Sequence, residues 1–228
     1  MAEQVEIGDP PIVVTVKRSA RARRYSLRIS SVDGAVSLSV PTRAKVAEAL
    51  DFARTKEGWL RKHLDAKPQA VAVGIGAELP IEGKLVRVVA GQGRLSTLSN
   101  GELAVPARGA TARVKAHLQT LARDRLTAAS DRYAAALGRS FVKITLRDTR
   151  SRWGSCTSEG GLMYSWRLIM APPTVLNYVA AHEIAHLQEM NHSKAFWDVV
   201  ERLYPDHLAA RKWLKEQGPG LHRYSFGK

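Results

Sequence analysis

The sequence contains a single cysteine, Cys156, in 228 residues. One cysteine excludes an intramolecular disulfide framework and favours a cytoplasmic setting over a secreted one. No apolar run approaches the roughly eighteen residues that a membrane-spanning helix needs. The acidic and polar start, MAEQVEIGDPP, does not have the pattern of a signal peptide. We therefore expect a cytoplasmic protein with no membrane partner.

Acidic residues are scarce relative to basic ones. Lys and Arg number 35 and Asp and Glu 21, so the formal net charge is 35 − 21 = +14. Residues 17–28 hold six basic residues and no acid, and residues 139–152 hold five basic residues against one acid. This excess is compatible with nucleic acid as a partner, although no recognition motif accompanies it. It is also compatible with a solubility role.

Residues 1–108 have the composition of a β-rich part. Runs of β-branched and aromatic residues predict strands within residues 12–40, with a hairpin at Asp33-Gly34. A second hairpin is predicted at Asn100-Gly101. Between them, the apolar spacing predicts one helix over about 43–64, with Thr42 as its N-cap.

Residues 109–228 are richer in predicted helix. A long helix is predicted from residue 110 to Gly138, followed by strands within 142–148 and 161–169 that a polar loop joins. A helix over about 173–189 and another after Ser193 complete the pattern. We see no internal repeat. The chain is predicted to be an α+β protein with two parts that meet near residue 108.

The stretch AAHEIAHLQEMNHSKAFW, residues 180–197, places His182 and His186 four positions apart on a predicted helix. Residues at this spacing share one helical face, so both imidazoles can reach one metal ion. Glu183 is rotated from His182 by about 100°, which puts its carboxylate beside the open position of the metal. HExxH zinc hydrolases have this arrangement, and their glutamate activates a zinc-bound water. The motif therefore predicts one Zn²⁺ ion and Glu183 as the catalytic base.

Catalytic zinc commonly takes a third protein ligand. His192 follows His186 by six residues, which is about 600° of helix, so the helix must break between the two. Asn191 is the expected turn residue, because Asn tolerates the left-handed conformation. Glu189 and Glu201 are alternative ligands, but the first points to one side and the second lies on the next helix. Metzincins share the histidine spacing but have glycine at the position of Glu189 and a methionine turn, which this sequence cannot form.

The stretch RSRWGSCTSEGGLMYSWRLIMAPPTVLNYVAAHEIAHLQEMNHSKAFWDVVERLYPD resembles the YgjP-like family of zinc metallopeptidases, which is related to the SprT-like and WLM proteases. The RWGSC and HExxH…NHSxxFW segments carry the resemblance, which covers about residues 147–215. It implies that His182, His186 and His192 bind zinc and that Glu183 is the catalytic base. It also implies a minimal zincin-like domain, with a small mixed sheet packed on the HExxH helix.

These observations predict a zinc-dependent endopeptidase that acts on a peptide or protein substrate. The substrate is expected to pair with an edge strand at about 162–168. Arg152, Tyr164 and Arg167 are candidates for a second electrophile, and the sequence does not choose among them. Cys156 is expected to be a small buried thiol and not a fourth zinc ligand.

Two alternatives stay open. The basic loop at 139–152 is compatible with phosphate binding, as in a metal-dependent nucleoside triphosphate pyrophosphatase, an activity assigned to some relatives of the family. However, the sequence lacks a glycine-rich phosphate loop and a paired-carboxylate magnesium site. The net charge is also compatible with a DNA-associated protease of SprT-like type, although the several cysteines of the SprT-type zinc ribbon are missing.

Overall fold

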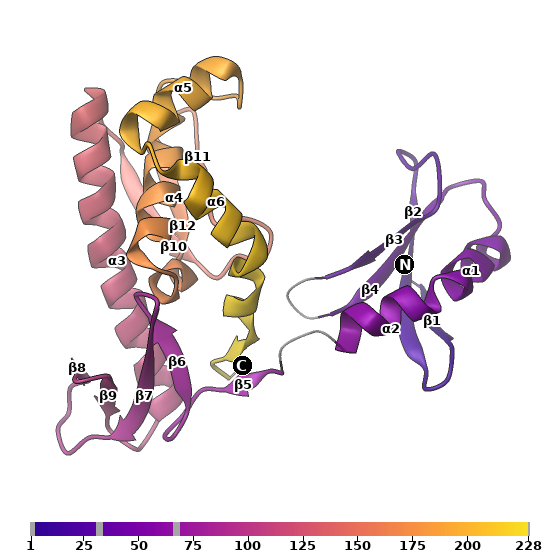
Figure 1. The fold of residues 1–228 in the computed structure, drawn as a ribbon, viewed down its shortest axis with the longest axis horizontal. Coiled ribbons are helices and arrows are strands. Elements are labelled where there is room, and N and C mark those ends of the chain that lie inside the picture. Colours follow the sequence, from indigo (N-terminus) through magenta and orange to yellow (C-terminus); the bar gives the residue numbers. More distant parts are fainter. Residues whose placement is uncertain (1–2, 31–33, 66–68, 228) are drawn as a thin grey trace. The chain divides into compact units, whose positions relative to one another are not determined.

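The computed structural model describes residues 3–30, 34–65 and 69–227. The chain divides into two compact units, Met1–Gln69 and Ala70–Lys228 (Figure 1). Each unit has its own hydrophobic core. The predicted α+β class is confirmed, with a β-rich part followed by a domain in which a small mixed sheet packs on the HExxH helix. Within the described ranges, no helix is both long enough and apolar enough to cross a bilayer.

The first unit is a four-stranded sheet with two helices. Its strand order is β1-β2-β4-β3, in which β2 and β4 run parallel and the outer strands pair antiparallel. Alternate residues of β2 and β4 are buried, and they form the core together with small and apolar residues of the helices. The elements are β1 (Glu3–Ile7), β2 (Ile12–Ser19), β3 (Ser26–Ile29), β4 (Val36–Pro41), α1 (Val46–Thr55) and α2 (Glu57–Asp65).

The helical region and the first hairpin of this unit differ in part from the sequence prediction. The predicted single helix over 43–64 is two helices, because α1 ends where the backbone N–H of Lys56 donates to the carbonyl of Ala53. The N-cap is Lys45 and not Thr42, and it makes no side-chain cap hydrogen bond. The antiparallel pairing of β3 and β4 agrees with the predicted hairpin, but the Asp33 half of its turn lies outside the described residues.

The second unit begins with β5 (Val71–Ala72) and a sheet with strand order β6-β7-β9-β8. Asn100 and Gly101 both have positive φ, at 49° and 78°, so the predicted hairpin between β8 and β9 is confirmed. Its pairing pattern repeats that of the first unit, an internal similarity that the sequence did not indicate. The strands are β6 (Glu78–Ile81), β7 (Lys84–Ala90), β8 (Thr97–Ser99) and β9 (Glu102–Val105).

This sheet is grouped with the C-terminal elements and not with the first unit. Leu79 and Val88 from its strands lie in the same buried cluster as Leu118 of the long helix α3 (Ala110–Leu137). The division therefore falls between residues 69 and 70, whereas the sequence analysis placed it near residue 108. The predicted C-cap of α3, Gly138, adopts a left-handed conformation with φ of 67°.

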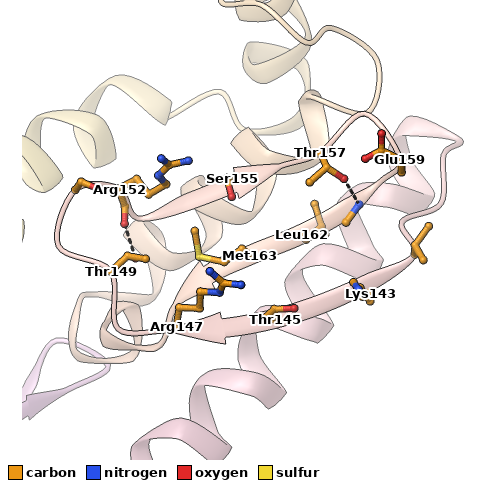
Figure 2. Close-up of a pocket in the computed structure, with 13 residues that line it drawn as sticks. Lys143, Thr145, Arg147, Thr149, Arg152, Ser155, Thr157, Glu159, Leu162 and Met163 are labelled. Atoms are coloured by element: carbon orange, nitrogen blue, oxygen red, sulfur yellow. Dashed lines mark hydrogen bonds between the residues drawn. The ribbon is translucent and has the colours of Figure 1, made fainter.

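The sheet next to the HExxH helix consists of β10 (Lys143–Arg147), β11 (Gly154–Cys156) and β12 (Gly161–Ser165) in the order β10-β12-β11. β10 runs parallel to β12, and β11 runs antiparallel to it. The register places Thr145, Met163 and Ser155 in one row across the sheet, on the face that Figure 2 displays. The alternate residues Leu162 and Tyr164 are buried in the core.

The prediction of an edge strand at 162–168 is wrong in two respects. β12 is the middle strand of its sheet, and residues Trp166–Met170 form a 3-10 helix, η1. The edge strand next to the HExxH helix is β11, which the sequence analysis assigned to a polar loop. A strand of three residues with Gly, Ser and Cys carries almost no β-propensity signal, which explains why the sequence did not reveal it.

The HExxH helix α4 (Pro173–Ala185) is followed by two further helices, α5 and α6, which both contact it. β13 pairs in parallel with β5, which joins the last described residues to the start of the unit. The elements are α5 (Lys194–Leu203), α6 (His207–Glu216), the 3-10 helix η2 (Gly218–Arg223) and β13 (Tyr224–Ser225).

Candidate metal centre

α4 carries the first two histidines of the predicted site. It begins at Pro173, which is a favourable first helical residue because its missing N–H would have no partner there. Most residues of α4 are buried, and they lie on more than one face of the helix, so the helix is held firmly in the core of the unit. His182 and His186 lie one turn apart with ring centroids 5.1 Å from each other. The predicted pairing of these two imidazoles on one face is therefore present in the structure.

The helix breaks before His192, as the spacing requires. α4 ends at Ala185, earlier than the predicted residue 189, and His186 is its C-cap. Asn191 then shapes the turn through its side chain, because its Oδ1 accepts a hydrogen bond from the backbone N–H of Ser193 at 3.0 Å. Its expected left-handed conformation is wrong, since the non-glycine residues with positive φ in the described chain are Glu82 and Asn100.

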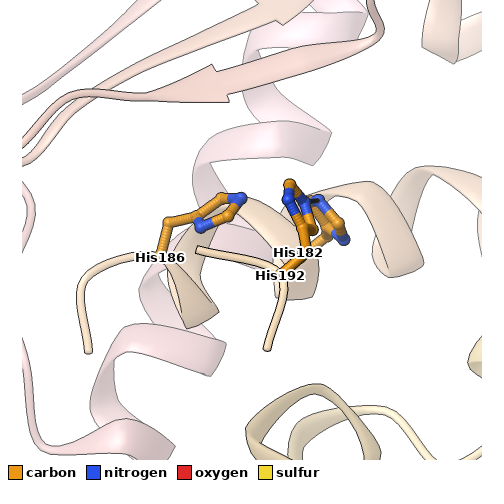
Figure 3. Close-up of side chains that lie close together, drawn as sticks. All are labelled: His182, His186 and His192. Carbon is orange, nitrogen blue, oxygen red and sulfur yellow. Dashed lines mark hydrogen bonds between the residues drawn. The ribbon is translucent and has the colours of Figure 1, made fainter. Parts of the chain in front are cut away.

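The break brings His192 to the other two histidines (Figure 3). One ligand atom from each of the three imidazoles lies within 4.8 Å of the others. The Nε2 atoms of His182 and His192 are 3.1 Å apart. Two ligands of a tetrahedral zinc ion, each about 2.05 Å from the metal, would be about 3.3 Å apart. The arrangement of the cluster therefore fits a zinc ion.

Burial favours the neutral form of His182 and His186, the form that metal ligation requires. Burial lowers the pKa of His182 to about 3, and the neighbouring histidines act in the same direction. Burial also lowers the pKa of His186. The Nδ1 atom of His186 donates to the carbonyl oxygen of Glu189 at 3.0 Å, which leaves its Nε2 lone pair for a metal. Phe196 of α5 stacks on His186 at a centroid distance of 4.4 Å and fixes its ring.

The other candidate ligands stay outside the cluster. Glu189 contributes its backbone carbonyl to His186. Glu201 pairs with His207, with Oε2 and Nε2 3.1 Å apart. Cys156 is half-buried and donates to the carbonyl oxygen of Thr157, and burial raises the pKa of its thiol to about 11. The donor set of the cluster is therefore three histidines.

Glu183 is buried at the edge of this centre, with 4% of its surface exposed. Burial raises the pKa of its carboxyl to about 8, while the positive charge of Arg152 acts in the opposite direction. Its carboxylate lies against Gly154 of β11, and a Cβ atom at that position would overlap the carboxylate. Glycine at 154 is thus what lets the edge strand pass close to Glu183. The RWGSC motif contains this glycine, but the sequence alone did not reveal its role.

Only one of the three candidates for a second electrophile reaches the centre. Arg152 is exposed and lines a cavity of about 450 Å³ together with Glu183 and the three histidines. Tyr164 is fully buried, and its hydroxyl lies 3.0 Å from the Oγ atom of Ser130. Arg167 is also buried.

Arg167 has a structural role. Its guanidinium donates two hydrogen bonds to the carboxylate of Asp148, at 2.6 and 3.1 Å. It also donates to the backbone carbonyls of Leu221 and Tyr224 in the C-terminal segment. Arg167 therefore ties that segment to the loop after β10 and does not face the histidines.

Comparison with known proteins gives one match. The family model described as YgjP-like, metallopeptidase domain matches residues 23–217. No curated protein and no solved structure matches the chain.

Proposed function

The chain belongs to the YgjP-like family of metallopeptidase domains, and from this premise we propose that it is a zinc-dependent endopeptidase. The observation that carries the proposal is the convergence of His182, His186 and His192 beside the buried carboxyl of Glu183. A cytoplasmic location, expected from the single cysteine, remains part of this proposal.

The three histidines would hold one zinc ion. Neutral imidazoles suit zinc among the common metals, and three protein ligands leave a position open for chemistry. When bound, zinc acts as a Lewis acid that polarises the scissile carbonyl and lowers the pKa of water. The hydrogen bond from His186 to the carbonyl of Glu189 supports this ligand set, because it fixes which ring nitrogen is free.

Glu183 would move the protons of the reaction. Its carboxylate accepts a proton from the attacking water and returns it to the nitrogen of the leaving amine. Burial raises its pKa to about 8, close to the pH at which a group can both accept and release a proton. Arg152 lines the same cavity and would donate a hydrogen bond to the carbonyl oxygen as negative charge develops on it.

The substrate would bind along β11. This strand is at the end of its sheet, and within the described ranges no other strand pairs with its outer edge. An extended peptide can add to such an edge through main-chain hydrogen bonds. Gly154 lies against Glu183, so the bound peptide would run past the carboxylate.

The test compares the wild-type chain with Glu183→Gln, both loaded with zinc, on an unfolded protein substrate. We expect cleavage by the wild type and a loss of about 100-fold or more in the variant, because general base catalysis typically contributes 10²–10⁴-fold. The variant keeps the three histidines, so its zinc content should match the wild type. Equal cleavage by the two proteins, or none by either across many substrates, would contradict the proposal.

The pyrophosphatase alternative can be separated from it with the same pair of proteins. Arg152 at the centre and Arg147 in the cavity across β11 would attract the phosphates of UTP. Phosphate release from UTP that depends on zinc and on Glu183, without cleavage of any protein, would favour this alternative.

Nucleic-acid binding is a second candidate role, which one feature of the first unit favours. A cavity of about 520 Å³ is lined by Tyr25, Phe52 and Trp59 beside Arg24 and Lys56. Trp59 is 44% exposed. Aromatic rings next to cations are the usual platform for stacked bases of single-stranded nucleic acid. Affinity for a single-stranded oligonucleotide should fall steeply with salt and in Trp59→Ala, and no binding at low salt would exclude this role.

A further inference from the structure

Another cavity, of about 720 Å³, lies on the outer face of the β10–β12–β11 sheet (Figure 2). Odd-numbered residues of the strands line it, including Lys143, Thr145 and Arg147 of β10 and Ser155 of β11. The alternate residues, such as Tyr164, pack into the core on the other face. The cavity is therefore a built feature of the outer sheet face.

The cavity is cationic. Lys143, Arg147 and Arg152 line it, against the single lining acid Glu159, which gives 3 − 1 = +2. The carboxylate of Glu159 already accepts a hydrogen bond from Ser158. Lys143 and Arg147 are exposed and make no ion pair with any residue that the structure describes. Two cations thus line this cavity with no carboxylate partner among the described residues.

This cationic cavity meets the metal-centre cavity along β11. Ser151, Arg152 and Ser155 line both cavities. Gly154 and Cys156 line only the cavity that contains the histidines. The edge strand therefore separates a catalytic side from a cationic side.

A peptide that pairs with the edge of β11 presents its side chains alternately to the two faces of the sheet. Side chains one position from those on the catalytic side would then lie on the face that carries the cavity, whose cations Lys143 and Arg147 are on β10, beyond β12. We propose that the cationic cavity is a substrate subsite that accepts an acidic side chain of the peptide. This inference rests on the proposed peptidase function and specifies its substrate class as peptides with Asp or Glu at alternate positions near the scissile bond.

A carboxylate fits the lining better than a nucleoside triphosphate. Arg147 can form paired hydrogen bonds with one carboxylate. Thr145 and Ser155, which share one row across the sheet, add hydroxyl groups to the lining of the cavity. The sequence has no glycine-rich loop to surround phosphates with backbone N–H groups. Each exposed ion pair contributes up to about fivefold in affinity, so two pairs together give at most about 25-fold, and we expect a preference of about tenfold.

The test measures peptide binding and not hydrolysis. Two fluorescent peptides are compared on the zinc-loaded, full-length Glu183→Gln protein: one has Asp at alternate positions, and the other has Asn at the same positions. We expect the Asp peptide to bind about tenfold more tightly. Adding Lys143→Gln and Arg147→Gln should abolish this preference.

A matched control removes the same charge elsewhere. Lys212→Gln and Lys215→Gln neutralise two exposed lysines of α6 that do not line the cavity. This variant should keep the tenfold preference. Equal affinity for the two peptides, a preference that survives Lys143→Gln and Arg147→Gln, or an equal loss in the α6 variant would overturn the proposal.

Two further results separate this inference from the proposed function. If the protein distinguishes the two peptides but its wild-type form cleaves neither, the result would support the subsite and contradict the proposed peptidase activity. Binding of UTP that depends on Lys143 and Arg147, with no preference between the peptides, would assign the cavity to phosphate and overturn the inference.

Discussion

Replacing Gly154 with alanine tests whether the close approach of β11 sets the position of Glu183. The added Cβ would overlap the Oε1, Cδ and Cγ atoms of Glu183. Glu183 is only 4% exposed, and the free space beside it is the cavity that contains the three histidines. Either the edge strand shifts outward or the carboxylate is displaced from the metal centre.

Both responses have a measurable cost. A shift of the strand corresponds to overpacking, which lowers the free energy of unfolding by about 1–3 kcal/mol. Displacement of the carboxylate by about 1 Å lowers kcat by about 100-fold. We expect both effects in Gly154→Ala. Zinc affinity should stay close to that of the wild type, because His182, His186 and His192 lie on α4 and the chain that follows it.

The assays are urea unfolding, initial rates of substrate cleavage and zinc titration. Gly74→Ala is the matched control in the same unit, because its Cβ would meet only the Oγ1 atom of Thr111, at 3.9 Å. The control should keep its rate and its stability within about 0.5 kcal/mol. Wild-type rate and stability in Gly154→Ala would refute the reasoning.

Three further predictions follow from individual contacts. Burial raises the pKa of the Cys156 thiol to about 11, so about one thiol in ten thousand is ionised at pH 7. Alkylation of Cys156 by iodoacetamide should therefore be slower than alkylation of a free thiol, and a faster reaction would contradict this burial. Asp148→Ala leaves the charge of Arg167 buried without its carboxylate partner and should lower the free energy of unfolding by about 2 kcal/mol. This is less than the loss expected for a fully buried pair, because the side chain of Asp148 is 41% exposed. Unchanged urea unfolding would contradict this role. Gly58→Ala adds a methyl group to α2 at a position where no atom lies within 4 Å. The variant should be more stable by up to about 1 kcal/mol, and a lower melting temperature in a thermal melt would contradict this prediction.

Features that depend on local periodicity could be predicted from the sequence. The four-residue spacing of His182 and His186 and the need for a break before His192 follow from helix geometry alone. The left-handed cap at Gly138 and the turn at Asn100-Gly101 follow from the backbone preferences of those residues. These features were found where they were expected.

Features that depend on tertiary packing could not be predicted from the sequence. β11 is a strand because β12 and the HExxH helix lie beside it, and its residues have no strand pattern of their own. Whether Arg152, Tyr164 or Arg167 reaches the centre depends on which side chains other parts of the chain cover. The sequence contains Asp148 and Ser130, but their contacts with Arg167 and Tyr164 span 19 and 34 residues and carry no local signal.

The zinc content of the purified protein, compared between the wild type and His192→Ala, tests the central claim most directly. The account predicts one zinc ion per wild-type chain. In the variant the loss of one of three ligands should weaken binding enough for dialysis to remove the metal. A wild-type chain that binds no zinc, or a His192→Ala variant that binds zinc as tightly as the wild type, would contradict a metal centre built from His182, His186 and His192.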